Sequence, residues 1–313
     1  MHNHDNNSDI ANHFQSKFKK ILDNKDCQKI NQKSEAVIYS EFSNRKMFYL
    51  TLNEMNNAIA RLKPMSGPDG IHANHFKLAP MDFKQLFLRF LNSCISHAFM
   101  PESMLVAEIT PRVNDKFGNA SNSNNYRPVM SSNTSLKIFE YSLLPTLERY
   151  ISISLNQFGY RKGTSTTMAV LTVKEIISKY VKSGTEVHAA FLDMSKAYDC
   201  LNHHTLIEKL LDSELPLSVV AILKSLYFNQ EFHTSYNDSK SGKHCIGNGI
   251  RQGGIMSGLL FNFYINNLVK RMNSKEKGCT LNGCKYALVA YADDIVVMAP
   301  SKQGLQQIVN DTC

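Results

Sequence analysis

The sequence predicts an α+β fold, with one antiparallel sheet and helices packed against it. Two observations lead to this prediction. Apolar residues recur at helical spacing in the earlier part of the chain, most clearly within 52–62 and 81–99. Short apolar runs of strand length come later, namely VHAAFLDM at 187–194 and the pair KYALVAY and IVVMA on either side of Asp293 and Asp294.

The first half of the chain is expected to consist of helices joined by polar connections. Residues 1–50 are polar and rich in Asn and Lys, with one weak helical pattern, and we expect a loosely ordered lead-in. The stretch MSGPDG is typical of a turn between the two helices named above. The polar run at 114–126 is expected to be a loop. Further helices are expected at 135–151 and 165–182.

The second half mixes strands with helices. The strand at 187–194 is followed by expected helices at 203–211 and 218–228. EFHTSY and KHCIGNG, on either side of NDSKSG, predict a hairpin, and a second hairpin carries Asp293 and Asp294 at its tip. Helices are also expected at 257–272 and 302–312.

Composition narrows the class of protein. A formal net charge of +8 is compatible with a polyanionic partner such as nucleic acid. Seven scattered Cys without a C-x-x-C pair indicate reduced thiols, and hence an intracellular protein, nuclear or cytoplasmic. No apolar run is long enough for a transmembrane helix, and the polar N-terminus lacks a secretory signal. We therefore expect no membrane partner.

Three carboxylates lie at the ends of predicted strands. Asp193 ends the strand at 187–194, and if that strand neighbours the second hairpin, Asp193 and Asp293 meet at one end of the sheet. Oxygen ligands without His or Cys suit Mg²⁺, and paired Mg²⁺ ions serve phosphoryl transfer. An isolated Asp293-Asp294 turn is more often simply solvated, and Asp193 or Asp199 could instead cap the following helix.

Six motifs occur together in one order. They are KPMSGPDGI (63–71), NNYRPV (124–129), QFGYRKGTST (157–166), FLDMSKAYDCLNH (191–203), GIRQGGIMSGLLFNFYINNL (249–268) and YADD (291–294). Each motif alone is a weak signal, but six in this order point to one family. From about residue 50 to the C-terminus, the sequence resembles the reverse transcriptase domain of LINE-type (non-LTR) retrotransposons.

The resemblance implies a right-hand polymerase with fingers and palm that acts as an RNA-directed DNA polymerase. Asp193, Asp293 and Asp294 correspond to its catalytic, metal-ligating carboxylates, together with the backbone carbonyl of Met194. Two Mg²⁺ ions, for which Mn²⁺ can substitute, are implied as cofactors. An RNA template, a DNA primer and deoxynucleoside triphosphates are the implied partners.

The resemblance also implies a nucleotide pocket. Tyr198 corresponds to the aromatic ring that leaves no room for a 2′-hydroxyl, although a Tyr at this spacing alone is better explained as a core residue. Gln252 and Gly253 correspond to contacts with the incoming nucleotide, and Arg127 to a clamp on its triphosphate. Two further basic residues are template contacts by the same resemblance, with a solvated surface charge an equal alternative: Arg161 and Lys162.

The sequence departs from the family pattern at three places. Asn114 stands where relatives usually carry a Lys, for which Lys116 is a nearby substitute, and Gly258 replaces the Pro of S-P-L-L-F. The chain stops soon after Asp294, so we expect an incomplete palm without a thumb. The expected division is a lead-in over 1–50, a fingers region over 51–185 and a palm over 186–313.

Two other functions remain open from the sequence. One is a truncated, catalytically inactive remnant of a retroelement that binds nucleic acid weakly. The other is the palm of a viral-type RNA-dependent RNA polymerase, against which Tyr198 and the R-Q-G segment argue.

Overall fold

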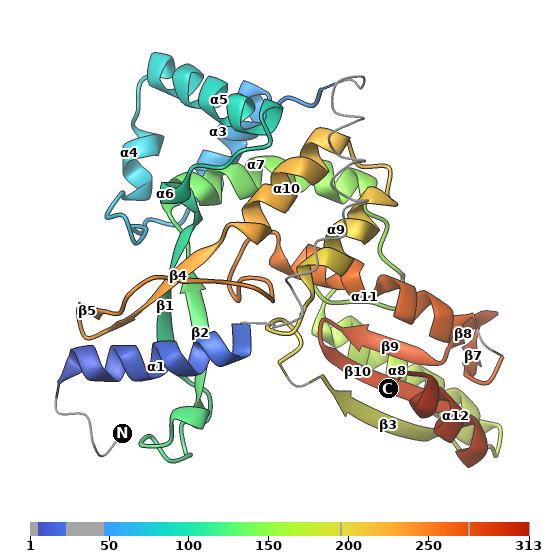
Figure 1. Ribbon diagram of the computed structural model, residues 1–313. Coiled ribbons are helices and arrows are strands. Elements are labelled where there is room, and N and C mark those ends of the chain that lie inside the picture. The colour runs from blue at the N-terminus through green and yellow to red at the C-terminus, as the bar shows by residue number, and fades with distance from the viewer. Residues whose placement is uncertain (1–5, 23–46, 195, 275, 313) are drawn as a thin grey trace. The chain divides into compact units, whose positions relative to one another are not determined.

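The chain forms two compact units, each built from two separate segments. The computed structural model describes residues 6–22, 47–194, 196–274 and 276–312 (Figure 1). Unit 1 takes in Met1–Tyr150 and Tyr198–Ser257, and unit 2 takes in Ile151–Ala197 and Gly258–Cys313. The chain leaves unit 1 after Tyr150 and returns to it at Tyr198. The expected division into lead-in, fingers and palm stays a prediction.

Unit 1 combines helices with a five-stranded sheet. The sheet follows the order β2-β1-β4-β5, with β6 also paired to β4. Its helices are α1 (Asn7–Leu22), α3 (Leu52–Arg61), α4 (Ala73–Lys77), α5 (Met81–Ser96), α6 (Glu102–Leu105), α7 (Thr134–Tyr150), α9 (His203–Leu211) and α10 (Leu217–Phe228), with a 3₁₀ turn η2 (Ser123–Asn125). Its strands are β1 (Val106–Val113), β2 (Tyr126–Ser131), β4 (Glu231–Tyr236), β5 (Ser239–Lys240) and β6 (His244–Cys245).

Helix α1 lies within the expected lead-in, yet it is well packed. Phe14, Phe18 and Leu22 are spaced four residues apart, so they share one face of the helix. All three are buried in the core that α1 forms with the sheet of unit 1. This part of the lead-in is therefore a regular element of the fold, and residues 23–46 lie outside the described part of the chain.

The prediction of a single sheet was wrong, although the antiparallel sheet expected around Asp193 and Asp294 is present in unit 2. The described residues form three sheets, and the largest contains a parallel pair, β1 with β4. Strands β1 and β2 were not predicted, because each contains a Pro, which usually argues against a strand in a sheet. Pro111 and Pro128 lie opposite each other in the β1–β2 ladder. Strand β2 is at the edge of the sheet, where Pro is tolerated.

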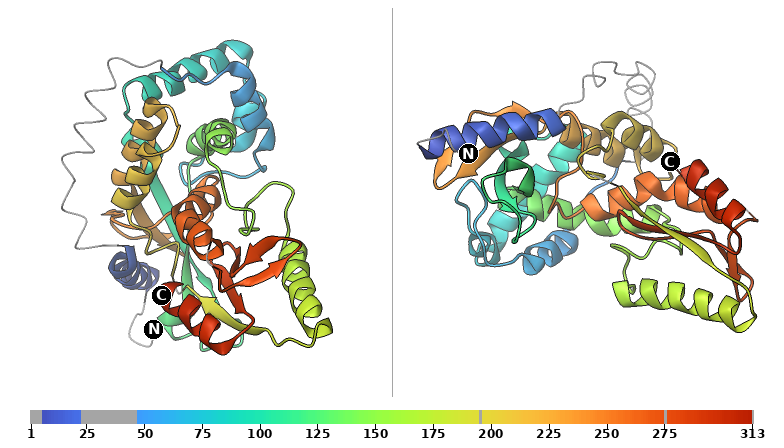
Figure 2. Two further views of the ribbon diagram at one scale, coloured as in Figure 1. Left: turned by 90° about the vertical axis from the view of Figure 1, so that its right-hand side faces the viewer. Right: turned by 90° about the horizontal axis from the view of Figure 1, so that it is seen from below.

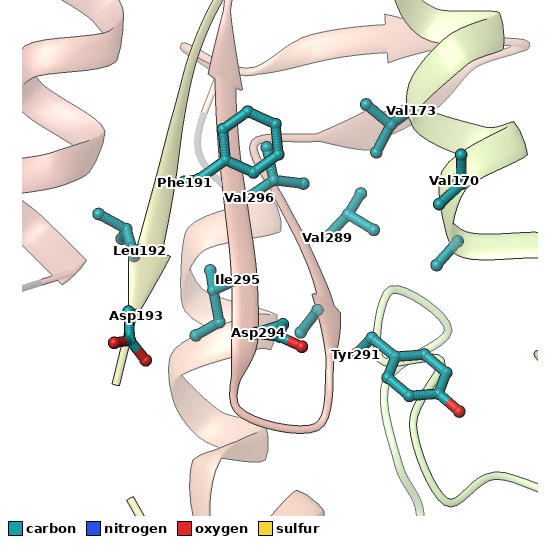
Figure 3. A pocket seen from close by; sticks show the side chains of 12 residues that line it. Val170, Val173, Phe191, Leu192, Asp193, Val289, Tyr291, Asp294, Ile295 and Val296 are labelled. Carbon is teal, nitrogen blue, oxygen red and sulfur yellow. The ribbon is translucent and has the colours of Figure 1, made fainter. Parts of the chain in front are cut away.

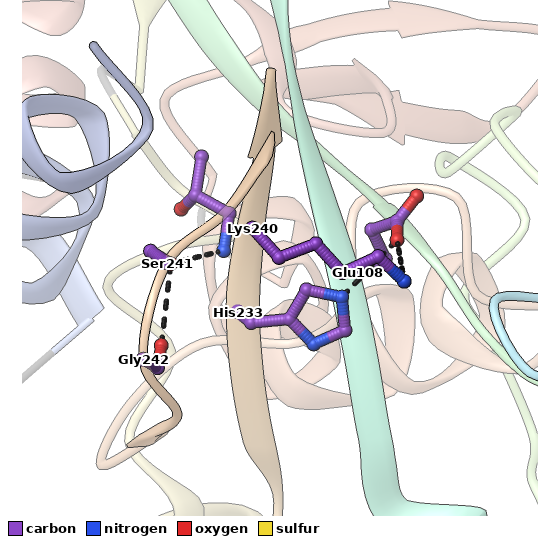
Figure 4. Close-up of polar contacts among 6 residues, drawn as sticks. Glu108, His233, Lys240, Ser241 and Gly242 are labelled. Atoms are coloured by element: carbon purple, nitrogen blue, oxygen red, sulfur yellow. Dashed lines mark hydrogen bonds and ion pairs between the residues drawn. The ribbon is translucent and has the colours of Figure 1, made fainter. Parts of the chain in front are cut away.

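A polar cluster crosses three strands of unit 1 (Figure 4). Glu108 on β1 lies opposite His233 on the parallel strand β4, and its Oε2 is 3.1 Å from both His233 Nε2 and Lys240 Nζ. Burial alone would raise the pKa of Glu108, but the hydrogen bonds from His233 and Lys240 lower it below its usual value. The cluster joins β1, β4 and β5 on one face of the sheet.

Unit 2 is built around a three-stranded antiparallel sheet in the order β3-β10-β9. Figure 2 shows α8 on one side of this sheet, and α11 and α12 on the other. A separate two-stranded ribbon pairs β7 with β8. The elements are α8 (Thr166–Lys182), β3 (His188–Asp193), α11 (Ser257–Asn273), β7 (Cys279–Leu281), β8 (Cys284–Tyr286), β9 (Leu288–Tyr291), β10 (Asp294–Ala299) and α12 (Lys302–Thr312).

Local sequence signals explain where several elements begin. Helix α3 starts with a capping box, in which the Thr51 hydroxyl accepts from Glu54 N and the Glu54 carboxylate accepts from Thr51 N. The Ser165 hydroxyl accepts from Met168 N at the start of α8. The helices predicted at 52–62, 81–99, 135–151, 165–182, 203–211, 218–228, 257–272 and 302–312 are all confirmed, with bounds that shift by up to three residues.

Candidate active site

Two of the three predicted metal-ligating carboxylates are direct partners on adjacent strands of the sheet in unit 2. Asp193 ends β3 and Asp294 begins β10, and the antiparallel register pairs these two residues directly. Asp294 also pairs with Tyr291, so Ala292 and Asp293 form a two-residue turn. We expected Asp193 to meet Asp293, but the direct partner is Asp294, because Asp293 belongs to the turn rather than to the strand.

This pairing is electrostatically unfavourable without a cation. Side chains directly opposite in an antiparallel ladder have Cβ atoms about 4.5–5.5 Å apart, and like charges there destabilise the sheet. In the described part of the chain, Asp193, Asp293 and Asp294 make no ion pair with Lys, Arg or His. Carboxylate oxygens without nearby His or Cys are the donors that a hard divalent cation prefers. The donor chemistry therefore fits Mg²⁺.

The described side chains do not form a closed metal cluster. No group of three or more His, Cys, Asp and Glu among residues 6–22, 47–194, 196–274 and 276–312 gathers closely enough to hold an ion. The main-chain carbonyl of Met194 accepts a hydrogen bond from Ala197 N at 3.0 Å, which leaves one lone pair for an ion. The site is thus an opposed pair of carboxylates beside a third, with its remaining ligands to be supplied from elsewhere.

An open apolar groove of about 440 Å³ adjoins the carboxylates (Figure 3). Its floor is the face of the sheet that carries Asp193 and Asp294, and Phe191, two residues before Asp193, is 83% exposed there. Val170 on α8 forms part of the opposite wall, across from Val289 on β9. The two carboxylates therefore lie at the border of an accessible apolar surface.

In unit 1, Tyr198 and Gln252 are held next to each other. Ile250 N donates to Tyr198 O at 2.9 Å, so the R-Q-G loop runs beside the chain that follows β3. Gln252 Nε2 donates to Asp199 Oδ1 at 2.8 Å, and Asp199 is buried. Gly253, with φ +102°, follows directly. The structure therefore brings together three of the four residues predicted for the nucleotide pocket.

A buried ion pair anchors the R-Q-G loop. Arg251 is 2% exposed, and its Nη1 lies 3.6 Å from Glu140 Oε1 and 3.0 Å from Ser132 Oγ. Glu140 also accepts from Ile255 N at 3.2 Å. A buried pair of this kind is costly to break from one side, since the other charge is left unpaired. No pattern in the sequence indicates that Arg251 has a structural role while the neighbouring Gln252 is a candidate for nucleotide contact.

The side chain of His203 holds the other end of the same loop. Its Nε2 lies 2.6 Å from Gly249 O, within the core of unit 1. Burial lowers the pKa of His203 to about 4, although the hydrogen bond to Gly249 by itself would raise it. His203 is therefore neutral near pH 7, and its Nε2 carries the proton that the carbonyl accepts.

Arg127 has a neighbour that sequence reasoning missed. It lies on β2 directly opposite Arg112 on β1, and both side chains are exposed. Neither guanidinium makes an ion pair or hydrogen bond within the described residues. Two opposed cations destabilise a ladder unless an anion lies between them. Arg112 lies in the P-R-V stretch (111–113) directly before the polar loop. Had this stretch been recognised as a strand paired with Tyr126–Ser131, side-chain alternation would have indicated that Arg112 lies beside Arg127.

The two predicted template contacts differ in their surroundings. Arg161 Nη1 lies within hydrogen-bond distance of the carbonyls of Ser154, Leu155 and Gln157, at 3.1–3.2 Å. That nitrogen therefore fixes the loop before α8, and a phosphate could use only the remaining donors. Lys162 is exposed, and its contact with a template stays a prediction.

Comparison with known proteins identifies the family. The family model described as reverse transcriptase (RNA-dependent DNA polymerase) matches residues 115–312, which is more than half of the chain. The chain belongs to the reverse transcriptase family. The resemblance to non-LTR retrotransposons drawn from the six motifs is confirmed by the relatives of this reverse transcriptase domain.

Three relatives show how far the similarity extends. The chain is 25% identical to a retrovirus-related Pol polyprotein from type-1 retrotransposable element R2 of Nasonia vitripennis, over 81% of this chain and 24% of that protein. It is 23% identical to the R2DM polyprotein of Drosophila melanogaster, over 84% of this chain and 24% of that protein. It is 24% identical to the RNA-directed DNA polymerase from mobile element jockey of the same fly, over 83% of this chain and 29% of that protein. The chain thus spans about a quarter of the length of these curated relatives.

The unusual Gly258 of this reverse transcriptase domain has a local cause. A Cβ at Gly258 would lie 2.2 Å from Cγ of Tyr160, whose ring covers the start of α11. Tyr160 itself has φ +47°. The absence of a side chain at Gly258 therefore leaves room for the Tyr160 ring.

The structure also bears on the expected partners. No described helix is both long and apolar enough to cross a membrane. The cellular compartment stays a prediction, and so do the nucleotide, primer and template contacts.

Proposed function

We propose that this chain contains the fingers and palm of an RNA-directed DNA polymerase, which adds deoxynucleotides to a primer 3′-hydroxyl. The observation that carries the proposal is the direct pairing of Asp193 with Asp294 beside the turn that contains Asp293. Two carboxylates that a sheet holds opposite each other, and that make no ion pair with a basic side chain in the described residues, suit a divalent cation.

The metal ligands proposed are Asp193, Asp293, Asp294 and the carbonyl of Met194, for two Mg²⁺ ions or Mn²⁺. When bound, such ions lower the pKa of the attacking 3′-hydroxyl and stabilise charge on the departing pyrophosphate. Because the described carboxylates form no closed cluster, we expect weak binding without substrate, with phosphate oxygens completing the coordination.

The nucleotide contacts proposed lie in unit 1. Arg127, joined by Arg112 opposite, would bind the triphosphate, since paired guanidinium groups supply donors that match phosphate oxygens. Gln252 and Gly253 would contact the nucleotide, and Tyr198 beside them would exclude a 2′-hydroxyl. Lys162, and the free donors of Arg161, would contact the phosphates of an RNA template.

The test is single-nucleotide addition to a DNA primer annealed to an RNA template, with Mg²⁺ and the 313-residue chain. Asp293→Ala should lower the rate by at least about 100-fold, as when a preorganised electrostatic contact is removed. Asp212→Ala is the matched control, because Asp212 is an exposed Asp at the end of α9. We expect it to leave the rate unchanged.

The alternatives predict other results. A catalytically inactive remnant would bind the duplex and extend nothing. An RNA-dependent RNA polymerase would prefer ribonucleotides. Extension that Asp293→Ala does not reduce would remove the carboxylates from the mechanism.

A further inference from the structure

The turn that carries Asp293 has an unfavourable backbone conformation. Ala292 precedes Asp293 and has φ +56°, in the left-handed region that residues other than Gly seldom adopt. Such a conformation persists only where surrounding contacts hold it. Ala292 is also buried, so its backbone polar groups need partners within the protein.

One side chain supplies both partners. Gln157 Oε1 accepts from Ala292 N at 2.8 Å, and Gln157 Nε2 donates to Ala292 O at 3.1 Å. The same Oε1 accepts from Gly159 N at 2.9 Å. Because a backbone N–H can only donate, the orientation of the amide is fixed by this network. Gln157 is 1% exposed, so water does not compete for these bonds.

The backbone around Gln157 is fixed to the neighbouring strand. Phe158 N donates to Ala290 O, and Ala290 N donates to Asn156 O, both at 2.8 Å. Gln157 thereby forms a parallel bridge with Ala290 at the free edge of β9. A Cβ at Gly159 would lie 2.3 Å from Ala292 N, so only Gly permits this approach. Residues 157–159, the Q-F-G segment, thus contact the turn through side chain and backbone.

We infer that Gln157 is a positioning residue that fixes the Ala292–Asp293 turn and so orients the Asp293 carboxylate for the cation. This inference rests on the proposed function, because it assigns Gln157 its importance through the metal site. Its physical basis is that Asp293 sits in a turn rather than in a strand ladder, so the β9–β10 pairing alone does not set its direction. The Gln157 amide supplies the missing constraint.

The chain offers a matched control for this role. Asn266 on α11 is also buried, and both the oxygen and the nitrogen of its side-chain amide make hydrogen bonds to main-chain groups. Its Oδ1 accepts from Ser154 N and its Nδ2 donates to Ser152 O, each at 2.8 Å. Neither bond touches the turn. A purely structural contribution should therefore be similar for Gln157 and Asn266.

The experiment compares Gln157→Met with Asn266→Leu in the 313-residue chain. Both replacements keep side-chain volume approximately and remove two hydrogen bonds, so both should lower Tm. Exchange of the Ala292 amide hydrogen, followed by NMR with ¹⁵N-alanine, should become at least about tenfold faster in Gln157→Met only. Mn²⁺ affinity, followed by electron paramagnetic resonance, should fall by about 10- to 100-fold in Gln157→Met only, as for residues that orient metal ligands.

Each outcome decides the inference. If Gln157→Met and Asn266→Leu change exchange and Mn²⁺ affinity alike, Gln157 is merely structural and the inference is wrong. If Gln157→Met does not fold, Gln157→Asn, whose shorter amide cannot reach both groups, should give the same pattern in smaller measure. If Asp293→Ala binds Mn²⁺ as tightly as the wild type does, the proposed metal site is wrong. The exchange rate of the Ala292 amide hydrogen then decides by itself whether Gln157 fixes the turn.

Discussion

Tyr198 is the residue on which the expected choice of sugar depends. Its carbonyl is bonded to Ile250 N, and Gln252 is bonded to the adjacent Asp199, so the ring belongs to the same small region as the proposed nucleotide contact. The spacing of Tyr198 after Asp193 could be read from the sequence. Its attachment to the R-Q-G loop could not, because that contact joins segments about fifty residues apart (Ile250 and Tyr198).

Tyr198→Ala should admit ribonucleotides while keeping the use of deoxynucleotides. Overpacking a site typically costs about 1–3 kcal/mol, so the wild type should discriminate against the 2′-hydroxyl by about 5- to 150-fold through this ring. Single-nucleotide addition with each nucleotide class measures the ratio. Tyr49→Ala, at an exposed Tyr in the same unit, should leave it unchanged. A ratio that Tyr198→Ala does not alter would make Tyr198 a core aromatic only.

For the opposed pair Arg112 and Arg127, we predict separate effects on the KM for the nucleotide and on Tm. Either Arg112→Ala or Arg127→Ala should raise the KM for the nucleotide by about tenfold or more, since hydrogen bonds to a charged group contribute about 1.5–3 kcal/mol. Neither should lower Tm, because each removes a repulsion between like charges. Steady-state kinetics and thermal unfolding test both parts, with Arg89→Ala on the exposed face of α5 as control. Unchanged KM values would exclude the pair from the nucleotide site.

At the scale of elements, local patterns predicted most helices but not the larger sheet. Helices such as α5 and α7 were recognisable because their apolar residues recur at helical spacing. Strands β1 and β2 were hidden by Pro111 and Pro128. The parallel pairing of β1 with β4 joins Glu108 to His233, and no short-range signal records such a distant partner. The Asp193–Asp294 register likewise became known only from the sheet.

The start of α11 offers a test of the Gly258–Tyr160 contact. Gly258→Ala would normally stabilise a helix by up to about 1 kcal/mol. Here the added Cβ meets the Tyr160 ring, so we expect destabilisation in urea unfolding. In a Tyr160→Ala background, the same substitution should instead stabilise. If Gly258→Ala has the same effect in both backgrounds, the ring does not determine the need for glycine at this position.

The link between α9 and the R-Q-G loop should make stability depend on pH. The folded pKa of His203 is about 4, below the ordinary value of 6.5, so the unfolded chain takes up the proton more readily. The corresponding stability is present above pH 6.5 and is lost as the pH falls toward 4. Between pH 7 and pH 5, His203 should account for about 2 kcal/mol of lost stability.

Urea unfolding of the wild type and of His203→Gln at both pH values measures this contribution. Gln can still donate to Gly249 O but does not titrate, so its stability should fall less with pH. An equal fall in both proteins would show that His203 does not take up a proton on unfolding in this range.

At the scale of the whole molecule, the proposed chemistry is divided between the two units. The carboxylates and Met194 belong to unit 2, and the proposed nucleotide contacts belong to unit 1. The chain passes between the units directly before Tyr198 and again at Gly258. The six motifs predicted from the sequence which residues matter, but this division became visible only in the fold, because each unit combines two segments.

We propose that Asp193, Asp293 and Asp294 share one site for the two Mg²⁺ ions. Asp193 and Asp294 are direct partners in the ladder, so their contributions to one site must be coupled. The most direct measurement is a double-mutant cycle for Mn²⁺ affinity, with Asp193→Asn, Asp294→Asn and the double variant. We predict that each single substitution weakens binding and that the double variant binds no more weakly than the worse single one. Affinities that all equal the wild type, or losses that simply add, would contradict a shared site.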